Sequence, residues 1–178
     1  MKRINKKIYI YFGIFLVFVL SACSSDPDFD LYKGKSLTIA VIGKPPQVRE
    51  EQIKFKQISF NQLTTDEMQL YDAVFIAKEH LYQASESKYV DIYLNSSIPF
   101  FFLSSNSHIP FTLKNERYDK KWDWTPGKSY AVGFIAQRGS QSLKYWGFGL
   151  YNDKKTDRNL RQLYSTIFEV IEGQNLEY

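Results

Sequence analysis

Cysteine and histidine are scarce in this chain. One cysteine, Cys23, and two histidines, His80 and His108, occur among 178 residues. A single cysteine closes no disulfide within the chain, so a folded domain must be stabilised by packing. Zinc sites take most of their ligands from cysteine and histidine, and no helical His-Glu-x-x-His spacing occurs. The sequence therefore predicts neither a disulfide framework nor a metal site.

Glycine-rich nucleotide-binding motifs are also missing. Gly34-Lys35-Ser36 and Gly127-Lys128-Ser129 match the end of a P-loop, but Phe29 and Trp122 stand where the earlier glycine is required. Gly43-Lys44-Pro45-Pro46 lacks the second and third glycines of a dinucleotide-binding fingerprint. No bound nucleotide or other cofactor is expected.

Residues 1–22 have the organisation of a secretory signal. Four basic residues and no acidic one precede an uncharged run of 13 residues, Ile8 to Leu20. A helix of that length rises about 20 Å, short of the roughly 30 Å hydrocarbon core of a bilayer. A basic start, a short apolar run and small residues at its end indicate a signal peptide that is removed.

The segment ends in Leu20-Ser21-Ala22-Cys23. These residues resemble the lipobox of bacterial lipoproteins at all four positions. The resemblance implies cleavage before Cys23 and a diacylglycerol on its thiol, and each buried CH₂ of such a lipid contributes about 0.8 kcal/mol to anchoring. It thus implies a protein held at the extracytoplasmic face of the cell membrane, with residues 23–35 as lipid anchor and tether. The alternative is an ordinary signal peptide with a coincidental cysteine.

The basic charge of the chain belongs to this segment. Four of the 23 Lys and Arg residues precede Cys23 and none of the 19 acidic residues does, which leaves 19 of each sign. A nucleic-acid interface needs a clustered basic face. Only the pairs Lys120-Lys121 and Lys154-Lys155 stand out, and both are expected in solvated loops. The sequence predicts no nucleic-acid partner.

Residues 36–178 are expected to form a single α/β domain, since their number suits one domain with a full core. Short apolar, β-rich runs predict the strands, and periodic or capped stretches predict the helices. The expected strands are 36–43, 53–60, 71–77, 98–103, 130–137 and 144–151. The expected helices are 65–70 with Thr64 as N-cap in a capping box with Glu67, 85–95, and a last helix capped by Thr156 or Asp157 and followed by Gly173 as its C′ residue.

The pattern predicts a three-layer, flavodoxin-like fold. Strands that are nearly all apolar and are separated by helices favour a mostly parallel sheet covered on both faces. The segment 138–142 suits the loop of a C-terminal antiparallel hairpin. The last helix is amphipathic, with a core-facing apolar stripe at steps of three and four residues. The stripe consists of Leu160, Leu163, Tyr164, Ile167, Phe168 and Ile171.

Polar segments follow three of the predicted strands, and ligands of open α/β sheets bind beyond the carboxyl ends of strands, where the strand order reverses. We expect these segments to meet in a crevice for a small polar or anionic molecule, with lysines as charges and serine and asparagine as hydrogen-bonding groups. The candidate ligand-binding residues are Lys44, Lys78, His80, Ser104, Asn106 and His108. The alternative is that such residues only cap turns.

A hydrolase would need a serine activated by a histidine with a carboxylate behind it. Ser104 or Ser105, His108 or His80, and Glu79 could fill these roles, but no Gly-x-Ser-x-Gly elbow surrounds the serines. The sequence therefore assigns no catalytic residue.

Aromatic residues make up 17% of the chain, and Trp122 and Trp124 lie close together in a charged loop. Exposed indole rings are favoured interface anchors, so this pair is a candidate site for an envelope protein or a cell-surface component. The alternative is that the rings close the core under the loop. The resulting hypotheses are a non-catalytic binding or accessory module of the cell envelope, a receptor for a small ligand in the crevice, and a hydrolase. Because no complete catalytic set is present, the sequence favours the first.

Overall fold

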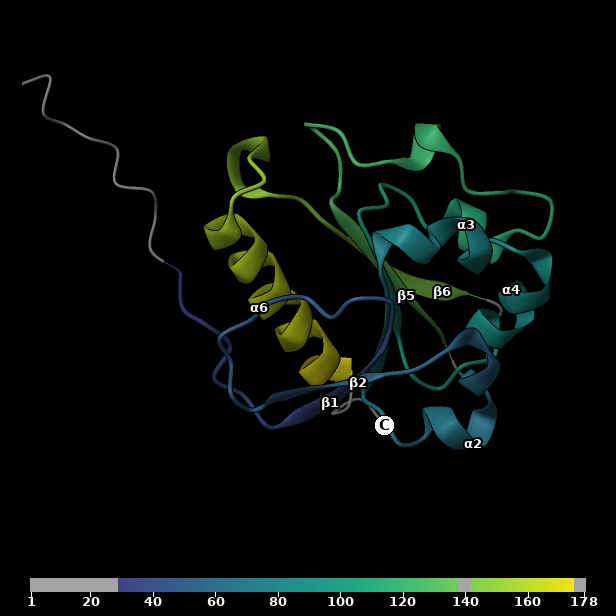
Figure 1. The fold of residues 1–178 in the computed structure, drawn as a ribbon, viewed down its shortest axis with the longest axis horizontal. Helices are drawn as coiled ribbons and strands as arrows, with labels where there is room; N and C mark the ends of the chain where they lie inside the picture. The colour runs from purple at the N-terminus through teal and green to yellow at the C-terminus, as the bar shows by residue number, and fades with distance from the viewer. Residues whose placement is uncertain (1–28, 138–141, 175–178) are drawn as a thin grey trace, which may run out of the picture.

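The computed structural model describes residues 29–137 and 142–174, and Figure 1 shows their arrangement. The signal segment, Cys23 and most of the hairpin loop lie outside this range. The strands are β1 (Leu37–Ile42), β2 (Ile53–Gln57), β3 (Ala73–Ile76), β4 (Phe100–Leu103), β5 (Ala131–Ala136) and β6 (Leu143–Phe148). The α-helices are α2 (Thr65–Met68), α3 (Leu81–Ala84), α4 (Ser87–Leu94), α5 (Ile109–Thr112) and α6 (Asp157–Gln174). The 3-10 helices are η1 (Phe60–Gln62), η2 (Lys78–His80), η3 (Lys120–Trp122) and η4 (Tyr151–Asp153).

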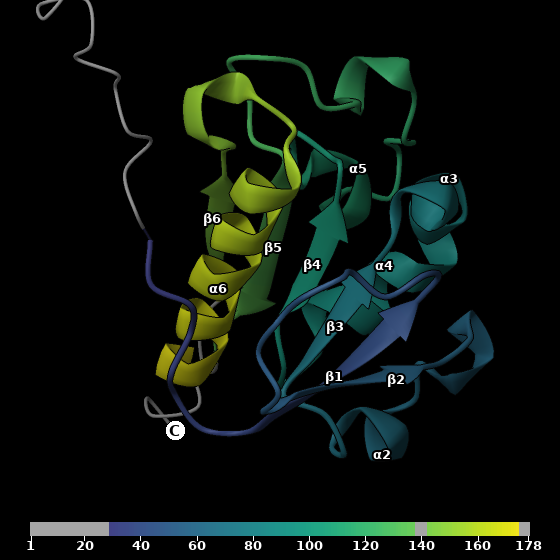
Figure 2. The same ribbon diagram turned by 60° about the vertical axis from the view of Figure 1, so that its left-hand side comes forward.

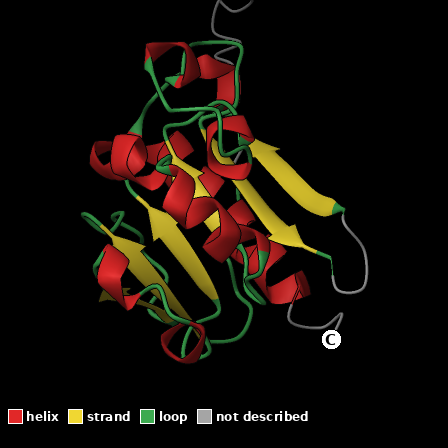
Figure 3. Cartoon of the chain, turned by 90° about the vertical axis from the view of Figure 1, so that its right-hand side faces the viewer, coloured by secondary structure: helices red, strands yellow, loops and turns green. Residues whose placement is uncertain are grey.

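The described strands form one sheet in the order β2-β1-β3-β4-β5-β6. β1 to β4 run parallel, and β5 and β6 are antiparallel to their neighbours. Figure 3 shows the hairpin at one edge of the sheet. The order β2-β1-β3-β4-β5 is the flavodoxin-like one, so the predicted fold class is confirmed. The strand order reverses between β1 and β3, which places the switch point there.

Helices cover both faces of the sheet, with α2 to α5 on one face and α6 on the other (Figure 2). Residues 43–52 join β1 to β2 without a helix, and the sequence predicts none there. Pro45 and Pro46 lie in this segment, and proline lacks the N–H that a helix needs. Val48 instead packs against the cluster under α6. In the described part of the chain, no helix has the length and apolar character that a membrane span requires.

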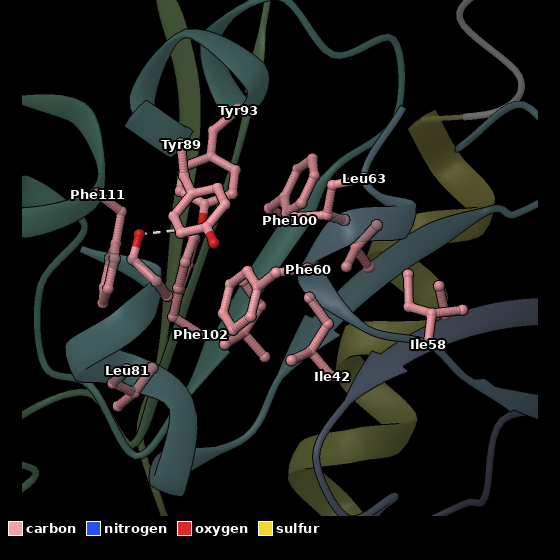
Figure 4. Close-up of a cluster of buried hydrophobic side chains, with 14 of the residues drawn as sticks. Ile42, Ile58, Phe60, Leu63, Leu81, Tyr89, Tyr93, Phe100, Phe102 and Phe111 are labelled. Atoms are coloured by element: carbon pink, nitrogen blue, oxygen red, sulfur yellow. Dashed lines mark hydrogen bonds between the residues drawn. The ribbon is translucent and has the colours of Figure 1, made fainter. Parts of the chain in front are cut away.

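Aromatic rings fill the core under α2 to α5, shown in Figure 4. Phe102 lies between Phe111 and Phe134, with ring centroids 3.7 and 5.6 Å away. Tyr93 is fully buried beside Phe102, and its hydroxyl donates a hydrogen bond to the carbonyl oxygen of Ala84 at 2.9 Å. The second core, under α6, contains the predicted apolar stripe. All buried residues of both clusters lie between Tyr32 and Ile171, so a chain that begins at Ser24 contains both cores.

The predicted start of the last helix agrees with the structure, and the predicted end is wrong. Thr156 Oγ1 accepts the N–H of Asn159 at 3.2 Å, as an N-cap does. Gly173 is not a C′ residue, since α6 continues to Gln174. The last turn is held by Glu172, whose carboxylate accepts the N–H of Lys35 at 3.2 Å. This long-range contact stabilises helix beyond the point where the local signal predicts its end.

The capping box predicted at α2 is half formed. Thr64 Oγ1 accepts the N–H of Glu67 at 3.4 Å. The Glu67 carboxylate accepts the hydroxyl of Tyr71 at 3.0 Å. A tertiary partner thus takes the carboxylate that local pattern assigns to the helix start.

Candidate functional site

The turn after β1 packs closely against η2 at the switch point. The Glu79 carboxylate accepts the N–H of Lys44 at 3.1 Å. Gly43 has φ +105°, and a Cβ there would lie 2.7 Å from the Ala77 Cβ and 2.8 Å from the side chains of Glu79 and His80. Burial acts to raise the pKa of Glu79, but hydrogen bonds from its own N–H and that of Lys44, with the charges of His80 and Lys44, lower it overall. The backbone N–H of Lys44 and the ring of His80 therefore both adjoin the turn after β1.

Lys78 and Asn106 are occupied by the loop that precedes β5. The Lys78 ammonium lies 3.7 Å from the carboxylate of Asp123. The side-chain amide of Asn106 donates to the carbonyl oxygens of Lys121 at 3.1 Å and of Asp123 at 2.8 Å. These contacts fix the loop to the strand ends. Asn106 therefore has a structural role, because both of its side-chain hydrogen bonds go to the backbone of this loop.

His108 lies apart from the strand-end residues. Its ring stacks on Tyr145 at 4.7 Å and meets Phe134 edge-on at 6.3 Å. Burial lowers its pKa. Five of the six predicted residues thus lie in three places: Lys44 and His80 adjoin the switch point, Lys78 and Asn106 hold a loop, and His108 lies on the α5 side.

Ser104 is buried and has φ 68°, an uncommon conformation for a residue other than glycine. Two backbone hydrogen bonds hold it, from its N–H to Tyr130 at 2.7 Å and from the N–H of Trp124 to its carbonyl at 3.0 Å. The Ser105 hydroxyl donates to the carbonyl of Ser107 at 2.9 Å. Within the described residues, no hydrogen bond joins Ser104 or Ser105 to either histidine.

Trp122 and Trp124 lie on opposite faces of the sheet. Trp122 packs against the core under α2 to α5, and Trp124 packs against the core under α6. The chain changes from helical to extended between them, since η3 ends at Trp122 and Asp123 has φ −61° and ψ 145°. Each indole N–H is enclosed and has no hydrogen-bond partner in the part of the chain that is described. The two rings do not form one platform.

Two hollows flank the turn after β1. One, of about 410 Å³, opens beside η1 and α3 and contains His80, Phe60 and Gln83. The other, of about 440 Å³, lies between this turn and the start of α6. We name the second the tyrosine pocket, and its chemistry comes from Lys44, Tyr130, Lys155, Asp157, Arg161 and Tyr164.

The two tyrosines of the pocket are almost completely buried, with 6% of Tyr130 and 7% of Tyr164 exposed. Neither hydroxyl makes a hydrogen bond within residues 29–137 and 142–174. The enclosed polar side-chain atoms that lack a partner in this range are the two indole nitrogens. The tyrosine hydroxyls are therefore not fully enclosed, and both residues line the pocket. Burial, and secondarily the neighbouring Tyr130, raise the pKa of Tyr164, which keeps its hydroxyl protonated as a donor.

The charges around the pocket are mostly positive. Lys44, Lys155 and Arg161 stand against the single carboxylate of Asp157. The Lys155 ammonium lies 5.3 Å from the centroid of the Tyr130 ring. No salt bridge joins any of the three cations to a described acidic side chain. The pocket also lies at the start of α6, where the helix dipole favours an anion.

No protein-family model, curated protein or solved structure matches this chain. The chemistry of the pocket therefore rests on its own residues. In the described ranges, no three acidic or histidine side chains lie close enough together to hold a metal ion. The donors of the pocket, two hydroxyls and three cations, outnumber its one acidic acceptor. This balance suits a phosphate or carboxylate group.

Of the pocket residues, only Lys44 is among the ligand-binding residues predicted from the sequence. Tyr164 belongs to the apolar stripe of α6 and Lys155 is exposed before this helix, as the sequence predicts. The missed signal is a tyrosine in the first turns of a core-facing helix, because tyrosine buries its ring and requires a partner or solvent for its hydroxyl. A second tyrosine directly before β5 completes the pair.

Proposed function

We propose that the protein is a membrane-anchored, extracytoplasmic binding module that holds a small anionic ligand in the tyrosine pocket. The observation that carries the proposal is a pair of unpartnered hydroxyls on two deeply buried tyrosines that line a pocket with three cations and one carboxylate. Its volume of about 440 Å³ is within the range of small-molecule sites. The ligand is held without chemical change, and the residues act as hydrogen-bond donors and counter-charges.

The anchor is the lipobox, with the lipid on Cys23. The ring of Phe29 lies 6.0 Å from the guanidinium of Arg158, in the first turn of α6. The tether therefore reaches the domain beside the tyrosine pocket. Five residues lie between Cys23 and Phe29, and the six steps from Cys23 to Phe29 have an extended reach of roughly 20 Å. With this anchor, the pocket would lie close to the membrane surface and would meet ligands of the cell envelope.

The binding proposal is tested on the soluble chain from Ser24 to Tyr178. Thermal unfolding is measured with inorganic phosphate, citrate and a sugar phosphate, each against a neutral compound of similar size. A ligand at one hundred times its Kd adds about 2.7 kcal/mol to stability. We expect a shift with anions that is lost in Arg161→Gln and retained in the control Arg117→Gln, an exposed arginine outside the pocket. Equal effects of anionic and neutral compounds would refute the proposal.

The anchor is tested separately on the full chain, expressed in a bacterial host with labelled palmitate. The wild-type chain should incorporate label and remain with membranes, and Cys23→Ser should do neither. Label in the variant, or none in the wild type, would contradict the lipid anchor and leave the ligand test unaffected.

A further inference from the structure

The outer edge of β6 is open for pairing. Gln137 donates its N–H to the carbonyl of Ser142 at 3.1 Å, next to the register pair Ala136↔Leu143. Hydrogen-bonded pairs alternate along an antiparallel ladder. Lys144, Trp146 and Phe148 therefore bond inward to β5, and the N–H and C=O groups of Tyr145 and Gly147 point outward. In the described part of the chain, these outward groups have no partner.

We propose that two copies of the chain pair through their β6 edges and form a symmetric dimer with a continuous sheet. An isologous interface must be complementary to itself. An antiparallel β6 pair with its two-fold axis at Trp146 meets this condition. Tyr145 of each copy then lies opposite Gly147 of the other and exchanges both N–H···O=C bonds with it. Leu143 lies opposite Gly149 in the same way.

Side chains along this edge fit the same register. Tyr145 is 63% exposed, and the glycine opposite it in the second copy leaves room for its ring. At Gly147 the fold itself requires a glycine, since a Cβ would lie 2.5 Å from the Ser129 hydroxyl oxygen. Gly149 is different, because a Cβ there would meet no atom within 4 Å and its φ is not positive. Gly149 lies directly after β6, and glycine along a strand can mark a bulge, a bend or a place where another backbone approaches.

The two edges of the sheet are protected differently. β2, at the opposite edge, carries the exposed lysines Lys54 and Lys56, and lysine is a common device against edge-to-edge pairing. β6 reads Leu-Lys-Tyr-Trp-Gly-Phe, with Lys144 alone. The exposed lysines thus disfavour strand pairing at the β2 edge, whereas the aromatic, glycine-containing β6 edge carries only one lysine.

The position of the tether agrees with two copies on one membrane. A two-fold axis perpendicular to the sheet keeps both α6 helices on the same side of the dimer. Phe29 contacts Arg158 of α6 in each copy, so both tethers arrive on that side. This point rests on the anchor proposed above, whereas the pairing of β6 edges does not.

The first test is analytical ultracentrifugation of the chain Ser24 to Tyr178, up to about 1 mM, the effective concentration that tethering to one surface can provide. We expect the average mass to rise towards twice that of the monomer. Tyr145→Pro should remain a monomer, because it removes an outward N–H, and proline is tolerated at such edge positions. The control Tyr145→Val removes the ring, keeps the N–H and should still dimerise. A monomeric wild type, or a dimer unaffected by the proline, would overturn the proposal.

A second pair of variants tests the register and does not depend on the proline variant folding. A chain from Ser24 has no cysteine. Trp146→Cys places two sulfur atoms at the two-fold axis and should cross-link under mild oxidation. Lys144→Cys places them about 14 Å apart along the paired strands, beyond the roughly 7 Å limit for a disulfide. Cross-linking of both variants to the same extent, or of neither, would contradict this register.

Discussion

Two buried tyrosines differ in what their hydroxyl groups contact. Replacing Tyr93 by phenylalanine should lower stability, whereas replacing Tyr164 by phenylalanine should weaken ligand binding. The Tyr93 hydroxyl donates to the carbonyl of Ala84 at 2.9 Å inside the core. The Tyr164 hydroxyl has no partner within the described residues, Tyr164 lines the tyrosine pocket, and its ring stacks on Phe75. Tyr93→Phe removes an internal hydrogen bond. Tyr164→Phe removes only the hydroxyl that we propose binds the ligand.

The structure sets the size of each effect. Tyr93→Phe leaves the Ala84 carbonyl without its donor in a dry environment, which costs about 1–3 kcal/mol of unfolding free energy. Tyr164→Phe breaks no internal bond and keeps the ring packing, so stability should change by less than about 0.5 kcal/mol. A hydrogen bond to a charged group contributes about 1.5–3 kcal/mol. Loss of the Tyr164 hydroxyl should therefore weaken anion binding about 10- to 100-fold.

Urea unfolding measures the stability of both variants, and isothermal titration with the anion found by thermal shift measures binding. Tyr93→Phe should be destabilised and should bind as the wild type does. Tyr164→Phe should be as stable as the wild type and should bind weakly. A Tyr164→Phe variant that loses as much stability as Tyr93→Phe, or that binds normally, would refute the assignment of this hydroxyl to a ligand.

Three further predictions concern the fold. Phe102→Ala should lower the unfolding free energy by about 3–5 kcal/mol in urea titrations, because it empties the space between two stacked rings; a loss below 1 kcal/mol would contradict this packing. Burial lowers the pKa of His108 from its ordinary 6.5. As the pH drops below 6.5, His108 is therefore protonated in the unfolded chain before it is protonated in the folded one, and the unfolding free energy should fall. This pH dependence should be absent in His108→Phe. The pKa of Glu79 is lowered from 4.5, so its stabilising contact with Lys44 should be complete above that value and lost as pH falls through the folded pKa. The stability difference between wild type and Glu79→Gln should therefore shrink in acid, and a constant difference would exclude this contribution.

Local pattern was sufficient for most of the sheet and for α4 and α6. The strands that became β1, β3 and β4 are short apolar runs with clear boundaries, and a run buried on both faces has few other places in an α/β domain. The 3-10 helix η2 and the helices α3 and α5 were not predicted. α3 and α5 have four residues each, too few for a hydrophobic period, and packing on the sheet rather than sequence propensity holds them.

The candidate site could be predicted only in part, because its residues come from three separated segments. Lys44 follows a predicted strand, and the switch-point rule identifies it. Lys155 and Arg161 carry no local signal, since an exposed cation before or in a helix is ordinary. Tyr164 belongs to the core by its spacing and to the pocket by its hydroxyl. Hydrophobic periodicity records the burial of a ring and does not show where a polar tip points.

The most direct test of the account follows backbone amide signals by nuclear magnetic resonance while inorganic phosphate is added to the chain Ser24 to Tyr178. Binding in the tyrosine pocket predicts saturable shifts centred on Lys44, Tyr130, Arg161 and Tyr164, all reduced in Tyr164→Phe. Shifts centred instead on the other hollow, at Phe60 and His80, or a spectrum unchanged by this and other small anions, would contradict the central claim that this pocket is the binding site.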